Sequence, residues 1–346
     1  MVKALSLFSG GLDSILAARV VMEQGVDVVA VQFVTPFFGL ELLGDIDSFK
    51  EETREKYGIN VIIEDISSGY LELLKKPDHG YGKNFNPCVD CKIFMLKRAK
   101  ELMNELGASF LITGEVLGQR PMSQRRDTLN VIERDSESRS ILLRPLSAKL
   151  MNPTIAEENG WVKREKLYDF SGRGRSRQIS LAKEMGMSDF PAPAGGCILA
   201  DPILSKRIRK VYENDFVISV NDITPGDITL MINGRQFGMP GGGWLILGRD
   251  EKENDLLEAL VNSDDVVLYM QERPGPFGVL RRASRFYQSD NLLRREIEAA
   301  ASLIVRYGKK VEGWEQGAEV TVCFKGQEEK ITAKPMDQKL SSPWIF

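Results

Sequence analysis

Three shortages in the sequence narrow the classes of protein to which it can belong. Four cysteines among 346 residues are too few for a disulfide scaffold. The apolar runs are short and interrupted, so no segment is expected to span a membrane. The N-terminus leads directly into a strand-like stretch and has no secretory or transit pattern, which predicts a cytoplasmic protein.

The composition is typical of a globular protein with hydrophobic cores. Hydrophobic residues make up 42% of the chain and charged residues 27%. A chain of 346 residues suggests two or three domains. The formal net charge is only -3, so any contact with nucleic acid must come from a local basic face.

Short apolar runs alternate with helical stretches in the first part of the chain. The apolar runs cover residues 4–8, 26–34, 60–66 and 109–113, and the helical stretches cover residues 13–24, 48–57, 68–75 and 92–107. This alternation predicts an α/β fold, in which a parallel sheet has helices on both faces. Ligands of such sheets bind at the carboxyl ends of the strands.

The alternation weakens after Asp201-Pro202, and the strands expected from about residue 215 onward are shorter and more irregular. A domain boundary is therefore expected near residues 205–215. The chain is expected to consist of an α/β domain over residues 1–205 and a smaller α+β domain over residues 210–346.

The segment Ser9-Gly10-Gly11-Leu12-Asp13-Ser14 follows the first strand and opens the first helix. Two adjacent glycines let the backbone approach an anion closely, and a helix N-terminus offers free N–H groups to phosphate. No Gly-Lys-Ser/Thr follows as in a Walker A loop, which argues against ordinary chemistry at a γ-phosphate. A plain glycine turn would explain Gly-Gly alone, whereas the full segment in this context favours phosphate binding.

Three of the four cysteines lie in polar segments that contain proline or glycine. Cys88 and Cys91 precede a predicted helix, and Cys197 follows Gly195-Gly196. Three thiolates could hold a cubane iron–sulfur cluster with one open iron. Two of the thiols could instead act as a persulfide carrier and a resolving thiol, or all three could be buried without chemistry. Cys323 lies in a strand-like run and is expected in the core.

The glycine-rich segment resembles a known signature. Ser9–Ser14 matches the PP-loop of the ATP pyrophosphatases. The resemblance implies a PP-loop fold of the adenine nucleotide alpha hydrolase kind and cleavage of ATP between the α and β phosphates. By the same resemblance, Ser9, Gly10, Gly11, Asp13 and Ser14 contact ATP, and Asp13 helps to hold Mg²⁺ or to position the phosphates.

Further motifs resemble the tRNA 4-thiouridine synthetases and 2-thiouridylases. They are Cys88-Val89-Asp90-Cys91-Lys92, Thr113–Gln119 with Ser123-Gln124, and Asn86-Pro87 together with Cys91 and Cys197. This resemblance implies an ATP site that includes Gly114 and Gln119 and a [4Fe-4S] cluster on Cys88, Cys91 and Cys197. It also implies catalytic roles for Asp13, Cys91 and Cys197. The implied partners are tRNA and a sulfur donor, either sulfide or a persulfide carrier.

Two basic segments are candidates for RNA contact. Arg173, Arg175 and Arg177 lie in a glycine-broken loop that could bind a phosphate backbone, close over the active site or simply be solvated. Residues 270–310 hold nine Lys or Arg against four Asp or Glu. Arg281, Arg282 and Arg285 stand there beside Phe286 and Tyr287, a combination that suits RNA phosphates and stacked bases. The alternative is a solvated helix face with Phe286 in the core.

The second half of the chain also resembles a known family. Gly243–Asp255 is similar to the signature of NFACT-R RNA-binding domains, which implies a domain that binds tRNA. His79 lies in a polar loop and is expected at the surface without a role.

Together these features favour an ATP-dependent tRNA sulfurtransferase that adenylylates a uridine and replaces its carbonyl oxygen with sulfur. Two alternatives remain open at this point: a PP-loop ATP pyrophosphatase that acts on a small molecule, and a nucleotide-sensing RNA-binding protein without thiolation activity.

Overall fold

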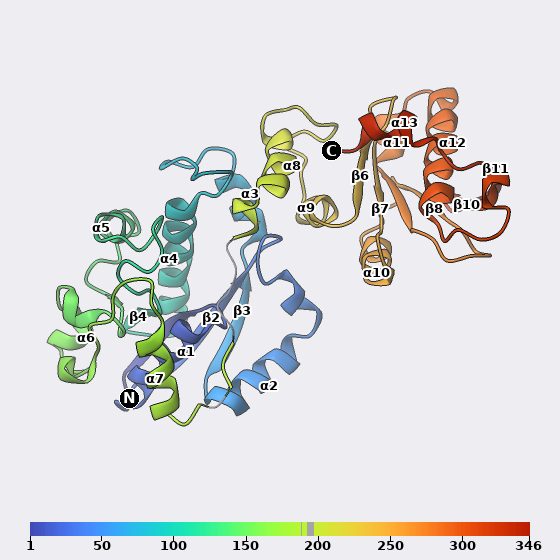
Figure 1. The fold of residues 1–346 in the computed structure, drawn as a ribbon. Coiled ribbons are helices and arrows are strands. Elements are labelled where there is room, and N and C mark those ends of the chain that lie inside the picture. The colour runs from blue at the N-terminus through green and yellow to red at the C-terminus, as the bar shows by residue number, and fades with distance from the viewer. Residues whose placement is uncertain (188, 192–196) are drawn as a thin grey trace. The chain divides into compact units, whose positions relative to one another are not determined.

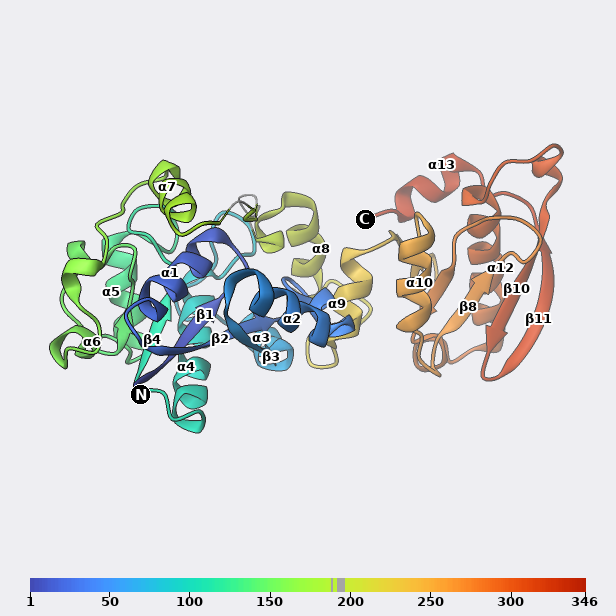
Figure 2. The same cartoon turned by 90° about the horizontal axis from the view of Figure 1, so that it is seen from below.

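The chain divides into two units, Met1–Ser205 and Lys206–Phe346, and the division falls within helix α8 (Pro202–Tyr212). The computed structural model describes residues 1–187, 189–191 and 197–346 (Figures 1 and 2). Gly195 and Gly196, which precede Cys197 in the sequence, lie outside the described residues.

A five-stranded sheet forms the centre of the first unit. Its strands are β1 (Lys3–Phe8), β2 (Asp27–Val34), β3 (Asn60–Asp65), β4 (Phe110–Thr113) and β5 (Leu142–Leu143). They are ordered β3-β2-β1-β4-β5, and every pairing is parallel. The prediction of a parallel sheet is confirmed. Strand β5 has two residues, which are too few to produce a recognisable sequence pattern.

Helices cover both faces of this sheet (Figure 1). They are α1 (Leu12–Met22), α2 (Ile46–Tyr57), α3 (Ser67–Leu73), α4 (Cys88–Glu105), α5 (Arg126–Asp135), α6 (Ile155–Glu158) and α7 (Ser176–Glu184). Successive side chains of a strand point to opposite faces. Strand β1 therefore places Ala4 and Phe8 in one core, with α1, and Leu5 in the other, with α4.

The order of the strands creates a switch point between β1 and β4. The chain runs outward from β1 through β2 to β3 and then returns to add β4 on the other side of β1. Ligands of open α/β sheets bind where the strand order reverses in this way, at the carboxyl ends of the strands. The segment Ser9–Ser14 leaves β1 at this point, and the segment Gly114–Gln119 leaves β4 there.

The second unit contains a six-stranded sheet of antiparallel pairs. Its strands are β6 (Arg235–Gly238), β7 (Trp244–Leu247), β8 (Val266–Tyr269), β9 (Gly278–Arg281), β10 (Ala318–Phe324) and β11 (Gln327–Ala333), in the order β11-β10-β8-β9-β7-β6. Helices α9 (Pro225–Ile232), α10 (Glu251–Ala259), α11 (Ala283–Phe286), α12 (Asp290–Tyr307) and α13 (Gln338–Ser341) accompany it. The prediction of a smaller α+β unit is confirmed.

One face of this second sheet packs against α12. Ala300 and Ile304 of α12 share a buried core with Val320 and Val322 of β10, whose spacing of two residues places them on the same face. Within the part of the chain that the structure describes, no helix has the length and apolar character needed to cross a membrane.

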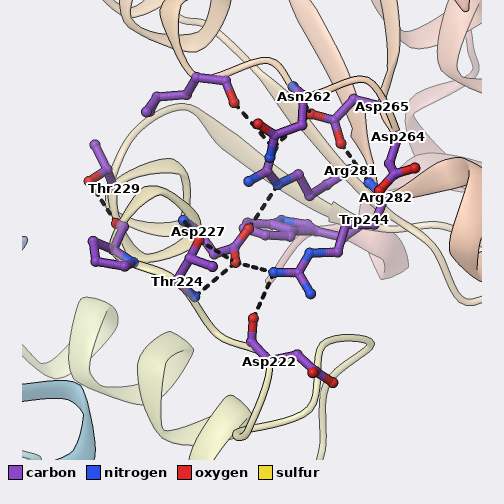
Figure 3. A network of polar contacts seen from close by, with 12 residues as sticks. Asp222, Thr224, Asp227, Thr229, Trp244, Asn262, Asp264, Asp265, Arg281 and Arg282 are labelled. Carbon is purple, nitrogen blue, oxygen red and sulfur yellow. Dashed lines mark hydrogen bonds and ion pairs between the residues drawn. The ribbon is translucent and has the colours of Figure 1, made fainter. Parts of the chain in front are cut away.

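A buried ion network joins α9 to the end of β9 (Figure 3). The Arg281 guanidinium donates to Asp227 at 2.8 Å and to Asp265 at 2.7 Å, and all three side chains are at most 2% exposed. Arg282 adds a second bond to Asp227, at 2.5 Å, and its backbone N–H donates to Asp265 at 2.7 Å. Thr224 also donates to Asp227, which lies in the first turn of α9. The network therefore fixes α9 to the sheet.

Removing one charge from this network should destabilise the second unit. Asp227→Asn leaves a buried guanidinium with one carboxylate instead of two, so we expect the free energy of unfolding to fall by about 3 kcal/mol. Urea unfolding of the full chain would measure this. The matched control is Asp264→Asn, whose ion pair with the mostly exposed Arg285 lies at the surface. If the two variants lost the same free energy of unfolding, the buried ion network would not be what fixes α9 to the sheet.

Candidate active site

The segment Ser9–Ser14 forms a tight loop between β1 and α1. Gly10 has a φ of +67°, a conformation that favours glycine. The Ser14 hydroxyl donates to the carbonyl of Gly11 at 2.7 Å and accepts from the N–H of Ser9 at 3.3 Å. Among the described residues, no side chain caps the N-terminus of α1. This end of the helix is therefore available to an anion.

Asp13, in the first turn of α1, is the centre of the site. Its Oδ2 accepts from Gln119 Nε2 at 2.6 Å and pairs with Arg175 Nη2 at 3.4 Å. Its Oδ1 is buried and has no hydrogen-bond partner among the described residues. One oxygen of this carboxylate is thus held by neighbouring side chains, and the other has unused capacity to accept a bond or to bind a cation.

Three segments that are distant in the sequence converge on Asp13. The N–H of Gly172 donates to the carbonyl of Leu117 at 2.8 Å, which ties the arginine-rich loop to the segment after β4. Gln178, which is buried on α7, donates to Gln119 at 3.1 Å. Helix α7 lies against α1, as both views show (Figures 1 and 2). Arg175 precedes α7 and is thereby placed beside the loop Ser9–Ser14.

Gly114 packs directly against this loop. A Cβ atom at Gly114 would lie 2.5 Å from both the carbonyl carbon of Asp13 and the amide nitrogen of Ser14. Only a residue without a side chain fits at this distance, because the opposing atoms belong to the backbone. The structure therefore indicates that Gly114 permits close packing between the end of β4 and the start of α1.

A second group of charges lies buried near the end of β4. Glu115 pairs with Arg144 at 3.0 Å and, at 3.7 Å, with Lys92, which follows Cys91 on α4. Burial alone would raise the pKa of Glu115, but the charges of Lys92 and Arg144 and hydrogen bonds from Arg144 and Thr113 hold that pKa below its ordinary value. Sequence reasoning missed Arg144. No sequence signal pointed to it, because Arg144 follows β5, whose two residues form no recognisable strand pattern.

The segments that carry the three cysteines meet in space. The N–H of Phe85 donates to the carbonyl of Leu199 at 3.2 Å, and Asn84 donates to the carbonyl of Ala200. Cys88 and Cys91 open α4, a few residues after Phe85, and Cys197 lies immediately before the turn Ile198–Ala200.

The three thiols are free and close enough to influence one another. Burial raises the pKa of Cys91 to about 11; the Tyr70 hydroxyl and Lys92 oppose this shift, whereas Cys197 and Cys88 add to it. Burial also raises the pKa of Cys197. Among the described residues, no group of three or more His, Cys, Asp or Glu side chains is arranged to hold a metal ion.

Tyr70 was not identified from the sequence, although it lies against the thiols. It is 1% exposed, and its hydroxyl hydrogen-bonds to Cys91. Phe37, Phe38 and Phe94 pack around its ring with centroid distances of 5.6, 5.8 and 6.5 Å. This aromatic cluster fixes the position of the hydroxyl relative to Cys91.

His79 is exposed, as expected from the sequence, but its side chain makes contacts that the sequence did not predict. Its side chain is 28% exposed, and it bridges two carboxylates, with Nδ1 3.0 Å from Asp90 and Nε2 3.0 Å from Asp135. Asp90 lies between Cys88 and Cys91 and is buried. His79 therefore ties the loop before α4 to both α4 and α5. A lone histidine in a polar loop gives no sequence signal for such a bridge.

The predicted RNA-contacting arginines of the first unit have three different environments. Arg173 is exposed. Arg177 pairs with Asp169 and stacks on Phe170, its guanidinium carbon 4.3 Å from the ring centroid. Arg175 pairs with Asp13 of the loop Ser9–Ser14, so its contact is within the candidate site rather than with a free surface.

In the second unit the prediction that Arg281 contacts RNA is wrong. Arg281 is 3% exposed and bonded to two carboxylates, so it is not accessible to a phosphate backbone. Arg282 is largely buried in the same network. Arg285 is 72% exposed and pairs with Asp264 at the surface, and Phe286 is 36% exposed rather than in the core. A pattern of charges along a sequence cannot distinguish a buried guanidinium from a solvated one.

Family models match both units. Residues 1–157 match the ThiI model, described as thiamine biosynthesis protein (ThiI). Residues 234–345 match the NFACT-R_2 model, described as NFACT protein RNA binding domain. Below, residues 1–205 are called the ThiI-like unit and residues 206–346 the NFACT-R-like unit.

Curated relatives share the first of these units. A protein of Desulfurococcus amylolyticus named "tRNA sulfurtransferase" is 30% identical over 173 residues, which is 49% of this chain and 34% of that protein. A protein of Thermococcus kodakarensis named "Probable tRNA sulfurtransferase" is 29% identical over 136 residues, which is 39% of this chain and 35% of that protein. The chain thus matches only about a third of the length of these relatives.

Among solved structures, a 4-thiouridine synthetase–RNA complex with bound ATP is 24% identical to this chain. The match covers 54% of this chain and 41% of the synthetase, with a TM-score of 0.38.

The contact at Gly114 leads to a test of the site geometry. Gly114→Ala should displace the start of α1, destabilise the ThiI-like unit by roughly 1–3 kcal/mol and weaken ATP binding. Thermal unfolding and ATP titration would measure both effects. Gly44→Ala is the matched control, because a Cβ atom there meets nothing within 4 Å. If Gly114→Ala bound ATP as the control does, the close packing would not matter to the site.

Proposed function

We propose that this chain is an ATP-dependent tRNA sulfurtransferase, which adenylylates a uridine and replaces its carbonyl oxygen with sulfur. The observation that carries this proposal is the convergence of Asp13, Gln119 and Arg175 at the end of β1, together with three thiols brought close to one another by two distant segments. The names of the curated relatives support the same activity.

In the first step ATP binds with its phosphates at the loop Ser9–Ser14. The uncapped N-terminus of α1 and the N–H groups of the loop bind the phosphate oxygens. The unpartnered Oδ1 of Asp13 fits a role in holding Mg²⁺, which would offset the phosphate charge. The uridine carbonyl oxygen attacks the α-phosphorus, the bond to the β-phosphate oxygen breaks, and pyrophosphate leaves. Arg175 is placed to stabilise the charge that develops on this leaving group.

In the second step a sulfur nucleophile displaces AMP from the adenylylated base. The carbonyl oxygen leaves readily only after adenylylation, which explains the requirement for ATP. Cys88, Cys91 and Cys197 supply the donor set of a cubane cluster that has one iron without a protein ligand. Such a cluster would provide an open position for the sulfur donor. Burial disfavours the thiolate of Cys91, so bound iron would have to offset that cost.

The NFACT-R-like unit is proposed to bind the tRNA. Arg285 and Phe286 are exposed there and suit a phosphate and a base, and Arg173 offers a cation on the ThiI-like unit. Arg281 and Arg282 are not included, because the ion network holds them. A protein that acts on tRNA with ATP is expected in the cytoplasm.

The decisive experiment is mass spectrometry of tRNA nucleosides from a deletion strain. Loss of one thiolated uridine is expected, and an unchanged set would favour a small-molecule acceptor.

Asp13 and Arg175 should both be needed for adenylylation. Asp13→Ala and Arg175→Ala are expected to lower the rate of AMP and pyrophosphate formation about 100-fold or more, because each removes a charge aimed at the phosphates. Arg175→Lys should retain part of the rate. Lys183→Ala, on the exposed side of α7, is the control. Normal product release by the Asp13 variant would overturn the assignment of the phosphate loop.

The cysteines allow a separate test of the sulfur step. Protein purified without oxygen should be brown and contain about four irons per chain. Cys88→Ser, Cys91→Ser and Cys197→Ser should each lose iron and thiolation, whereas Cys323→Ser should keep both.

Other outcomes of this test are also informative. Anaerobic protein without iron, but with Cys91 and Cys197 still essential, would indicate the persulfide mechanism. Full activity of both the Cys91 and the Cys197 variant would exclude sulfur transfer at this site and, with it, the proposed function.

A further inference from the structure

A surface depression of about 620 Å³ lies beside the candidate active site in the ThiI-like unit. It is lined by Leu117, Gly118, Arg125, Arg126, Asp127 and Asn130. The lining contains two guanidinium groups and one carboxylate, so it carries a net positive charge. A second depression in the same unit, near α2, has two acidic and two basic residues in its lining and no such preference.

The backbone around the first depression is held by hydrogen bonds. Buried Gln124 accepts from the N–H of Gly118 with its carbonyl, at 2.6 Å, and from the N–H of Arg120 with its side chain, at 3.1 Å. The turn from Gly118 to Gln124 is thereby closed, and Arg125 and Arg126 follow it directly. The backbone that leads into Arg125 and Arg126 is therefore fixed by the fold.

The depression adjoins the nucleotide site along the chain. Leu117 and Gly118 line it, and the next residue, Gln119, donates to Asp13 in the phosphate loop. Leu117 is also bonded to Gly172, so the loop that carries Arg173 lies beside it. A ligand in the depression would thus lie next to the place where the α-phosphate of ATP is expected.

The two guanidinium groups of the lining retain donors that an anion could use. Arg126 donates to the carbonyl of Leu150 at 2.8 Å, a contact that positions its guanidinium without neutralising it. Arg125 pairs with Asp127 at 3.0 Å, but both side chains are more than 60% exposed, so an incoming phosphate could compete for Arg125. Guanidinium groups bind phosphate oxygens in bidentate fashion.

We propose that this depression binds a phosphodiester group of the RNA strand that carries the target uridine. The inference rests on the proposed function. The phosphates of ATP itself belong to the loop Ser9–Ser14, so the anion left for Arg125 and Arg126 is one on the acceptor substrate. Binding there would bring the nucleotide to be modified up to the α-phosphate and would give the ThiI-like unit its own contact with RNA.

The test is the salt dependence of tRNA binding by the full chain. Bulk tRNA from cells that lack this protein is titrated at several salt concentrations. Arg126→Gln is expected to weaken binding about tenfold at low salt and to reduce the slope of log K against log salt by about 0.9, because one phosphate contact is lost. Arg126→Lys keeps the charge and should restore the slope. The dissociation constant for ATP should stay within about twofold.

A matched control and a double variant make the result decisive. Lys50→Gln removes a cation from the second depression and should change neither quantity. If Arg125→Gln combined with Arg126→Gln leaves both the tRNA affinity and the salt slope unchanged, this inference is wrong while the proposed function stands. Equal losses of ATP and tRNA affinity would assign the depression to the nucleotide and also overturn the inference. If the unaltered chain binds no tRNA, the inference and the proposed function both fail.

Discussion

The carboxylate of Asp13 is the constraint on which the rest of the candidate site depends. One of its oxygens is bonded to Gln119, from the segment after β4, and to Arg175, from the loop before α7. Gly114 must lack a side chain for β4 and α1 to come together here, and buried Gln178 must hold Gln119. Asp13 thus joins three segments of the chain. Its pairing with Arg175 keeps a cation beside the loop Ser9–Ser14.

The thiols are subject to a different constraint, which is the cost of burial. Cys91 lies in a buried environment that disfavours its charged form, and Tyr70 and Lys92 oppose this. Such a thiol is unreactive until a positive partner arrives. Lys92 in turn pairs with Glu115, which also pairs with Arg144, so this cation beside Cys91 belongs to the charge network at the end of β4.

The main features of the ThiI-like unit could be predicted from the sequence, because apolar strands and the loop Ser9–Ser14 have local patterns. Cys88, Cys91 and Cys197 were identifiable as residues, but their meeting depends on backbone bonds between Phe85 and Leu199 and between Asn84 and Ala200, which no local pattern encodes. The same limit explains the error at Arg281. Its two carboxylate partners, Asp227 and Asp265, come from separate turns, and burial is a property of the packed unit.

The distance along the chain between the two cysteine segments has a consequence for biosynthesis. Ribosomes add about 5–20 residues per second, so roughly 5–20 s pass between the synthesis of Cys91 and that of Cys197. During that interval the bonds from Phe85 and Asn84 to Leu199 and Ala200 cannot form, and Cys88 and Cys91 lack the third thiol that folding brings near them. Any chemistry that needs all three sulfurs must therefore wait until the second segment has left the ribosome.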